Sequence, residues 1–352
     1  MAEQSRVAAG VASREGGVRG VAAFDMVVQS RLLLGFQYAV LFAMVATVAT
    51  KVWQDHVWFG WALVGVATAA ALPEFWSRRD RRWWMIYVAG IFVYTLLRSY
   101  ADETAMPVRT AYAIDVDSWF FGGTDPVVRF QEAFFSATRV TALDIAAVAV
   151  HWSFFIAPHA GAAVIFFWRR SLFPRYAALV VGTMYLGLLL FFLVPTTPPW
   201  LAAQHGALPG AFRVMDFVGG RVDSGTYQSF YASLGEPNSV AAMPSIHLAV
   251  TLAMYLWARA HAPRFAWPLL VYTAVMGLAL VYLAEHYVLD LAAGAACAII
   301  CFQVVWRLLP AREESGGLLV DAGAGRLETR LLRTHDHFAA TDEEVAAGAE
   351  GA

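Results

Sequence analysis

The chain has 352 residues, of which 59% are hydrophobic and 14% aromatic, and its formal net charge is −2 at pH 7. A chain this apolar carries more hydrophobic surface than a soluble fold can bury, so its composition predicts a membrane protein. The near-neutral charge, without a basic domain or stripe, argues against a nucleic-acid partner.

Eight apolar stretches are long enough to cross roughly 30 Å of hydrocarbon as a helix, which takes about 20 residues. In chain order they are residues 31–53, 57–76, 83–98, 142–168, 175–194, 241–259, 266–285 and 288–308. The third is the shortest. The predicted fold class is all-α, a polytopic helical membrane bundle of about eight spans.

The sequence divides into two polar ends and a membrane-embedded middle. Residues 1–30 show no apolar core followed by a cleavage site, so no secretory signal peptide is expected. The tail is rich in Gly, Ala, Glu, Asp and Arg, which is typical of disorder. The expected domains are a disordered cytoplasmic N-terminus (1–30), two N-terminal membrane helices (31–82), a membrane domain with the candidate site (83–309) and its two long loops (99–140 and 195–240), and a disordered cytoplasmic tail (310–352).

Arginines in short loops set the expected orientation, because positive charge is retained on the cytoplasmic side. They follow the second, fourth and sixth spans: Arg78, Arg79, Arg81 and Arg82; Arg169, Arg170 and Arg175; Arg259 and Arg264. All of them fall on one side, so both termini are expected inside the cell and both long loops outside. The segments MPSIH and EHYVLD then lie at the outer face, together with Arg98.

The segment MPSIH (243–247) opens the sixth span with Pro244, Ser245 and His247. Proline fits the first position of a helix because it has no N–H to lose. The following turn would offer free N–H groups and the positive end of the helix dipole to an anion. The Ser245 hydroxyl can donate one more hydrogen bond, and His247 can supply a proton. A helix-capping serine beside an interfacial histidine is the alternative interpretation.

The segment EHYVLD (285–290) places His286 and Asp290 four residues apart, on one face of a helix. The carboxylate can hold one imidazole nitrogen as N–H and leave the other as a nucleophile or base. Alone, such a pair is more typical of a structural contact between helix ends. Together with MPSIH at the same membrane boundary, it supplies the groups that phosphoryl transfer through a phosphohistidine requires.

MPSIH, followed about 40 residues later by EHYVLD, is similar to the second and third signature blocks of the type 2 phosphatidic acid phosphatase superfamily. The likeness is strongest to the inositolphosphotransferase-like branch that contains inositol phosphorylceramide synthases and their actinobacterial relatives. PTTPPW (195–200) resembles the PTxPPW element of this branch, and residues 106–131 resemble a stretch with the pattern D-x-x-[LF]-F-G. The resemblance runs from about residue 90 to residue 305.

This resemblance implies a six-helix phosphatase-like core and chemistry that needs no metal or other cofactor. It implies that His286 receives the phosphoryl group, that Asp290 orients His286, and that His247 protonates the leaving group. It also makes Ser245 a ligand of a phosphate oxygen.

The chain departs from the family pattern at several positions. Ile246 stands where many phosphatases have glycine, and Ala279 and Leu280 replace the usual Ser-Arg of the third block. The Lys and Arg-Pro of the first block are also missing. Arg98 is therefore the first candidate for binding the phosphate, with snorkelling to the interface as its alternative role. The missing basic residues favour the transferase-like branch.

Two further features have more than one interpretation. Asp144 and His151 share a face of the fourth span. They are candidates for binding the hydroxyls of an acceptor, or for hydrogen bonds between helices. The aromatic residues at 119–121 are expected in the outer headgroup region, as a lid over the site or as an interfacial anchor.

The predicted function is a membrane enzyme that moves a phosphoryl group or phospho-head-group from a lipid donor to an alcohol or polyol acceptor. With water as the acceptor the same residues would make a lipid phosphate phosphatase. A proton-sensing transporter would predict inverted repeats, and no convincing repeat is found. A metal hydrolase using His247, His286 and Asp290 as ligands is a third alternative.

Overall fold

The computed structural model of the chain describes residues 78–98, 106–222 and 240–309, together with four single positions. Those positions, Gly35, Ala39, Phe42 and Ala46, are all helical. The predicted N-terminus, the rest of the first two spans and the predicted tail lie outside the described residues.

The described residues are helical, without a strand among them, which confirms the all-α class for this part of the chain. Two isolated parallel bridges join Thr196 to Arg109 and to Ala241. The helices are α4 (Arg78–Arg98), α5 (Ala111–Phe120), α6 (Pro126–Phe134), α7 (Ala142–Ser153), α8 (Ala157–Trp168), η3 (Arg170–Leu172), α9 (Phe173–Leu193), α10 (Pro199–Gln204), α11 (Val214–Val222), α13 (Ile246–His261), η4 (Pro263–Phe265), α14 (Ala266–Tyr282) and α15 (Val288–Leu308).

Three stretches of helix among the described residues are long and apolar enough to cross a membrane: Arg170–Leu193, Pro263–Tyr282 and Val288–Leu308. Leu189, Leu278 and Ile300 on these helices are about half exposed, as side chains facing hydrocarbon would be. The chain is therefore a membrane protein, although the predicted total of eight spans is not established.

The predicted fourth span is broken rather than continuous. Helices α7 and α8 meet at an angle of 45°, and they give a fourth spanning segment if they are counted together. Pro158 lies in the first turn of α8. Proline is accepted there but cannot continue a helix from the preceding turn, because it lacks an N–H and its ring crowds the chain before it. This explains the break.

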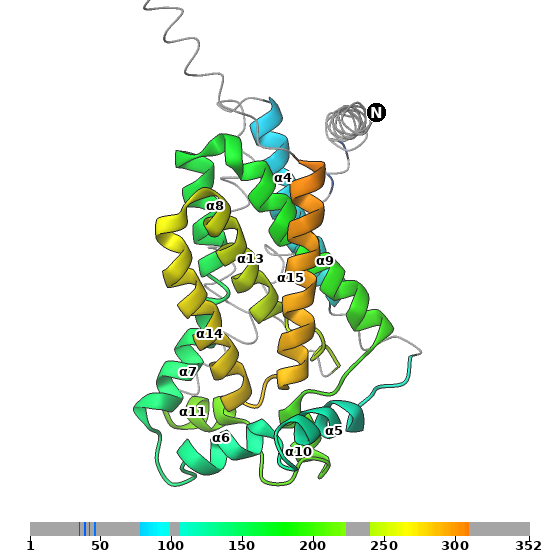
Figure 1. The fold of residues 1–352 in the computed structure, drawn as a ribbon, viewed down its shortest axis with the longest axis vertical. Helices are drawn as coiled ribbons and strands as arrows, with labels where there is room; N and C mark the ends of the chain where they lie inside the picture. The colour runs from blue at the N-terminus through cyan, green and yellow to red at the C-terminus, as the bar shows by residue number, and fades with distance from the viewer. Residues whose placement is uncertain are drawn as a thin grey trace, which may run out of the picture. The chain divides into compact units, whose positions relative to one another are not determined.

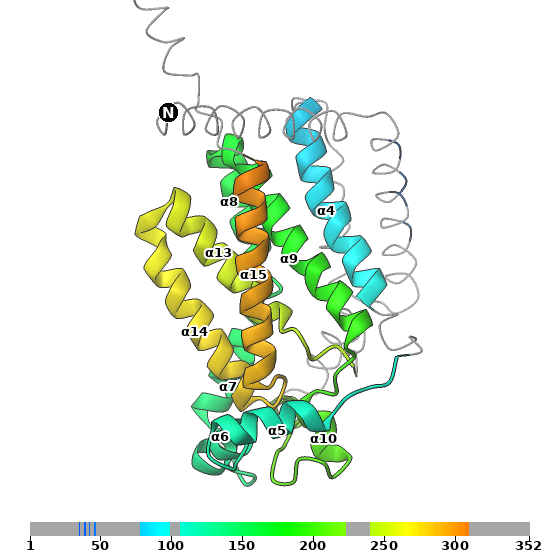
Figure 2. The ribbon, with the colours of Figure 1, turned by 45° about the vertical axis from the view of Figure 1, so that its right-hand side comes forward.

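Helix α13 packs against α9, α14 and α15, while α4 packs on α9 and α7 packs on α14 (Figure 1). A core of aromatic and small side chains joins them, with Ala249 and Ala253 of α13 fully buried. The short helices α5, α6 and α10 lie across one end of this bundle in both views (Figure 2). They belong to the two segments that the sequence predicts as long loops. The candidate site residues lie at this same end of α13 and α15.

Candidate active site

Helix α13 begins at Ile246, two residues later than the proline pattern predicts. Ser245 is its N-cap, and Pro244 precedes the cap instead of occupying the first helical position. The Ser245 Oγ accepts a 3.4 Å hydrogen bond from the Leu248 N–H, so the serine satisfies one of the free donors of the first turn. Its hydroxyl proton remains available to a further acceptor. The Ser245 N–H donates to the carbonyl oxygen of Asp290 at 2.9 Å, which joins the two signature segments directly.

Asp290, His286 and His247 form a chain of side chains. His286 Nδ1 lies 3.4 Å from Asp290 Oδ2, and His286 Nε2 lies 3.4 Å from His247 Nδ1. Asp290 is fully buried and His286 is 5% exposed. The carboxylate thus faces one nitrogen of His286, as the four-residue spacing of these two residues predicts, and the second histidine faces the other nitrogen.

A tight turn delivers His286 to this position. Ala284, two residues before His286, has a φ of 62°, in the left-handed region that non-glycine residues rarely adopt. The N–H groups of Glu285 and His286 both return to the carbonyl oxygen of Leu280, which closes the end of α14. The chain then enters α15 at once, so the turn fixes His286 between the end of one helix and the start of the next.

The beginning of α15 is held by a carboxylate from a distant segment. Asp117 Oδ2 accepts from the Val288 N–H at 2.6 Å, and Asp117 Oδ1 accepts from the Leu289 N–H at 3.0 Å. A carboxylate at a helix N-terminus accepts hydrogen bonds from the free N–H groups and interacts favourably with the positive end of the helix dipole. Asp117 is the aspartate of DSWFFG (117–122), the D-x-x-[LF]-F-G pattern, so this motif supports the helix that carries Asp290.

The PTTPPW segment ties the surrounding loops together. The Thr196 N–H donates to Val240 and the Thr197 N–H to Arg109. The Trp200 N–H donates to the carbonyl oxygen of Ala284 at 2.9 Å, directly before Glu285. These contacts make the segment a support for the turn that presents His286.

The family model of the PAP2 superfamily matches residues 114–304, which is more than half of the 352 residues. The chain belongs to the PAP2 superfamily. The matched region contains the Asp290, His286 and His247 chain together with the PTTPPW segment. The superfamily suggested by the sequence motifs is therefore confirmed.

Two curated proteins with similar sequences are both named as inositol phosphorylceramide synthases or their catalytic subunit. The inositol phosphorylceramide synthase of Candida albicans is 28% identical over 171 residues, which are 47% of this chain and 36% of the relative. The inositol phosphorylceramide synthase catalytic subunit aur1 of Schizosaccharomyces pombe is 28% identical over 137 residues, or 38% and 32% of the two chains. The matches span about a third of these relatives' lengths. No solved structure matches significantly.

The structure explains why this PAP2 chain has Ile246 where glycine is common in the superfamily. Ile246 is 5% exposed and packs against α9 at Gly187. A Cβ built at Gly187 would lie 2.0 Å from Ile246 Cδ1, far inside van der Waals contact. The bulk at position 246 thus fills a space that a glycine on α9 leaves open. Gly294 of α15 plays a similar part, because its Cβ would lie 2.4 Å from the carbonyl oxygen of Ser245.

The two candidate acceptor ligands on α7 have different surroundings. Asp144 Oδ2 accepts from the Thr141 N–H at 2.7 Å, and its Oδ1 accepts from the hydroxyl of Tyr282 on α14. Asp144 therefore makes the interhelical hydrogen bond that was its alternative role. His151 instead lies beside the candidate site, with its ring centroid 4.6 Å from that of His247.

Arg98 occupies the last turn of α4 and is partly exposed. Its role as a phosphate ligand stays a prediction.

Sequence reasoning missed Arg213, which no motif contains. Its Nε lies 3.2 Å from Glu285 Oε1, and Glu285 directly precedes His286. Both side chains are largely buried, and burial raises the pKa of Glu285 while Arg213 opposes that rise. The guanidinium also stacks over Trp200 at 4.1 Å, so Arg213 joins EHYVLD to PTTPPW. Only the three-dimensional structure brings these segments together.

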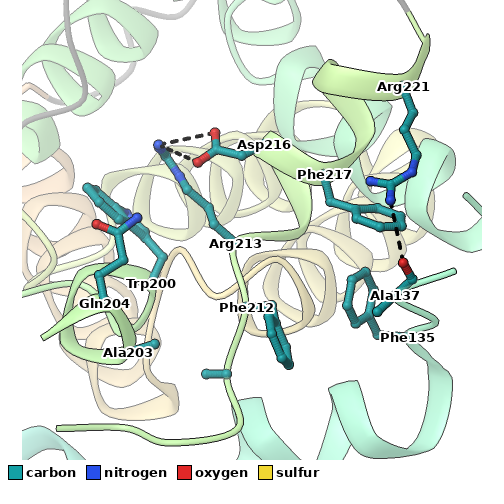
Figure 3. A pocket seen from close by; sticks show the side chains of 11 residues that line it. Phe135, Ala137, Trp200, Ala203, Gln204, Phe212, Arg213, Asp216, Phe217 and Arg221 are labelled. Atoms are coloured by element: carbon teal, nitrogen blue, oxygen red, sulfur yellow. Dashed lines mark hydrogen bonds and ion pairs between the residues drawn. The ribbon is translucent and has the colours of Figure 1, made fainter. Parts of the chain in front are cut away.

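Arg213 also borders a pocket of about 500 Å³ at the capped end of the bundle (Figure 3). Four aromatic side chains contribute to its walls, and Figure 3 shows Arg213 reaching toward Asp216 while Arg221 reaches the carbonyl of Ala137. The lining residues are Phe135, Ala137, Trp200, Ala203, Gln204, Ala211, Phe212, Arg213, Asp216, Phe217 and Arg221. Across residues 78–98, 106–222 and 240–309, no group of three or more His, Cys, Asp or Glu side chains is arranged to hold a metal ion.

Proposed function

We propose that this PAP2 protein transfers a phospho-head-group from a membrane lipid to an alcohol, through a phosphohistidine on His286. The observation that carries the proposal is the buried chain from Asp290 to His286 to His247, with 3.4 Å between the nitrogens of the two histidines. This arrangement supplies an oriented nucleophile and a proton carrier on the side where a phosphoryl group would bind.

In the first step, Nε2 of neutral His286 attacks phosphorus and the P–O bond to the leaving group breaks. His247 gives its proton to the leaving oxygen. In the second step, the oxygen of the acceptor attacks phosphorus, the N–P bond breaks, and His247 takes the acceptor's proton. Asp290 holds the Nδ1 proton of His286 and stabilises the charge that develops on the ring. The 3.4 Å gap requires the two histidine rings to separate when the phosphoryl group enters.

The phosphate oxygens are bound by the first turn of α13 in this proposal. The free N–H groups and the positive end of a 16-residue helix favour an anion, and the Ser245 hydroxyl adds a donor. Arg98 contributes positive charge from the end of α4. These groups would replace the lysine and arginines that the usual first and third blocks provide.

The names of the two relatives suggest the donor and acceptor classes. Both are called inositol phosphorylceramide synthase, which points to a phosphoinositol group and a lipid alcohol. For this chain we propose only the general classes: a lipid that carries a phospho-head-group as the donor, and a hydroxyl group as the acceptor. Positive charge in the loops opposite the site supports a reaction at the outer face of the cell membrane, with both termini inside the cell.

The test is product analysis with purified protein and donors labelled in the phosphate, namely phosphatidic acid and phosphatidylinositol. Each donor is incubated with and without a long-chain alcohol, and with a polyol. We expect label to appear in a new ester only when an alcohol is present, and His286→Asn to abolish it. Release of free phosphate or head group alone would make the protein a phosphatase. Full turnover by His286→Asn would reject the mechanism.

A further inference from the structure

His151 is buried in a way that an ordinary packing residue would not need. Its side chain is 4% exposed, and its Nδ1 is buried without a hydrogen-bond partner among the described residues. Leaving such a nitrogen unpaired is unfavourable, because the group loses its hydrogen bonds to water and gains none in the fold. A phenylalanine would fill similar space without that cost, so the nitrogen itself requires an explanation.

The surroundings of His151 connect it to the candidate site rather than to the lipid. Its ring lies 4.6 Å from His247 and 6.0 Å from Phe155, measured between centroids. Phe154 also packs on His247, at 4.4 Å. These three side chains come from α7 and the break before α8, and all three rings lie within 6.0 Å of the His247 ring, measured between centroids. His247 thus lies beside two other imidazoles, those of His151 and His286.

The proposed chemistry leaves a place for such a nitrogen. His247 moves a proton to the leaving oxygen in the first step and from the acceptor oxygen in the second. That reacting oxygen has a second lone pair, and it carries developing negative charge in both transition states. A fixed donor beside His247 would stabilise that charge, and the aromatic wall would strengthen the effect by excluding water.

We propose that His151 is a catalytic residue whose Nδ1–H donates a hydrogen bond to the oxygen that leaves in the first step and attacks in the second. This inference rests on the proposed function above. The number of protons transferred in each step is unchanged, because His151 keeps its proton and only His247 transfers one. The unpaired nitrogen gains a hydrogen-bond partner when the substrate binds.

The experiment compares two leaving groups in His151→Phe, which keeps an aromatic ring against His247 and removes the nitrogen. One substrate pair is dioctanoyl phosphatidic acid with p-nitrophenyl phosphate. The other is dioctanoyl phosphatidylinositol with the p-nitrophenyl ester of phosphoinositol. The pair that the wild-type protein turns over is used. His151→Asn is the matched control, because its amide nitrogen can occupy the place of Nδ1.

Loss of a donor to a charged oxygen is expected to lower kcat by about 10- to 100-fold for the lipid leaving group. The nitrophenolate needs little stabilisation, so its release in the first turnover, before the shared second step limits the rate, should fall less than about threefold. His151→Asn should recover most of the lipid activity. An equal loss with both leaving groups would show a packing role, and an unchanged rate would show none; either overturns the inference. If the wild-type protein turns over neither pair, the proposed function fails first.

Discussion

At the scale of single residues, Asp125 shows how burial is expected to make stability depend on pH. Its Oδ1 caps α6 by accepting from the Val127 N–H at 2.8 Å, while Oδ2 has no partner among the described residues. Burial raises the pKa of Asp125 from 3.8 to about 6. The folded protein therefore holds this proton more tightly than the unfolded chain does.

Because the folded state binds this proton more tightly, the free energy of unfolding falls as the pH rises. The stabilising contribution of Asp125 is complete below a pH of about 4 and is lost as the pH rises through about 6. Asp125→Asn keeps a capping oxygen and removes the titration. We expect it to raise the thermal midpoint in detergent at a pH of about 8 and leave it unchanged near 4, with about 2–4 °C for each kcal/mol. A variant that is equally or less stable at the higher pH would contradict this account.

The Arg213 and Glu285 pair is predicted to act as a unit. Arg213→Gln leaves a largely buried carboxylate without its nearest positive partner, which raises the pKa of Glu285 further and destabilises the fold. Adding Glu285→Gln should recover part of this loss, with a coupling of about 0.5–3 kcal/mol. Thermal midpoints of the two single variants and the double variant measure it. Strictly additive effects would show that the two side chains are independent.

At the scale of elements, the N-terminus of α15 depends on a carboxylate from α5. Asp117→Ala removes the acceptor of two backbone N–H groups, which should cost about 0.5–2 kcal/mol and displace the start of the helix that follows His286. Activity should fall more than stability does. Asp115→Ala is the matched control, since Asp115 is exposed on the same helix. Equal effects of both substitutions would remove the capping role of Asp117.

The contact between α9 and α13 can be tested by adding side-chain volume at Gly187 and removing it at Ile246. Gly187→Ala alone would place a methyl group 2.0 Å from Ile246 Cδ1, so we expect it to push α13 away and reduce both stability and turnover. Ile246→Ala should make room for that methyl and restore part of the loss in the double variant. Gly182→Ala is the control, because its Cβ would meet only Cys301 Sγ, at 3.9 Å. No rescue in the double variant would contradict the packing account.

At the scale of the whole molecule, the sequence predicted the reactive side chains of the site, but not the residues from other segments that hold them in place. His286 and Asp290 were predictable because helical spacing and the motif spacing both point to them. Arg213 was not, because its partners lie in two other segments of the sequence. The broken fourth span was missed because hydropathy averages over Pro158, and Ile246 was unexplained because its partner Gly187 lies on another helix. Periodicity reports which face of a helix is buried, but not what meets it.

The proposed mechanism depends on one covalent bond, between phosphorus and Nε2 of His286. The most direct test is rapid quenching of wild-type protein with a donor labelled in the phosphate, under alkaline conditions that preserve phosphohistidine, followed by mapping of the labelled peptide. We expect label on His286, its discharge when an alcohol is added, and no label in His286→Asn. Label on another residue, or turnover in a protein that never becomes labelled, would contradict it.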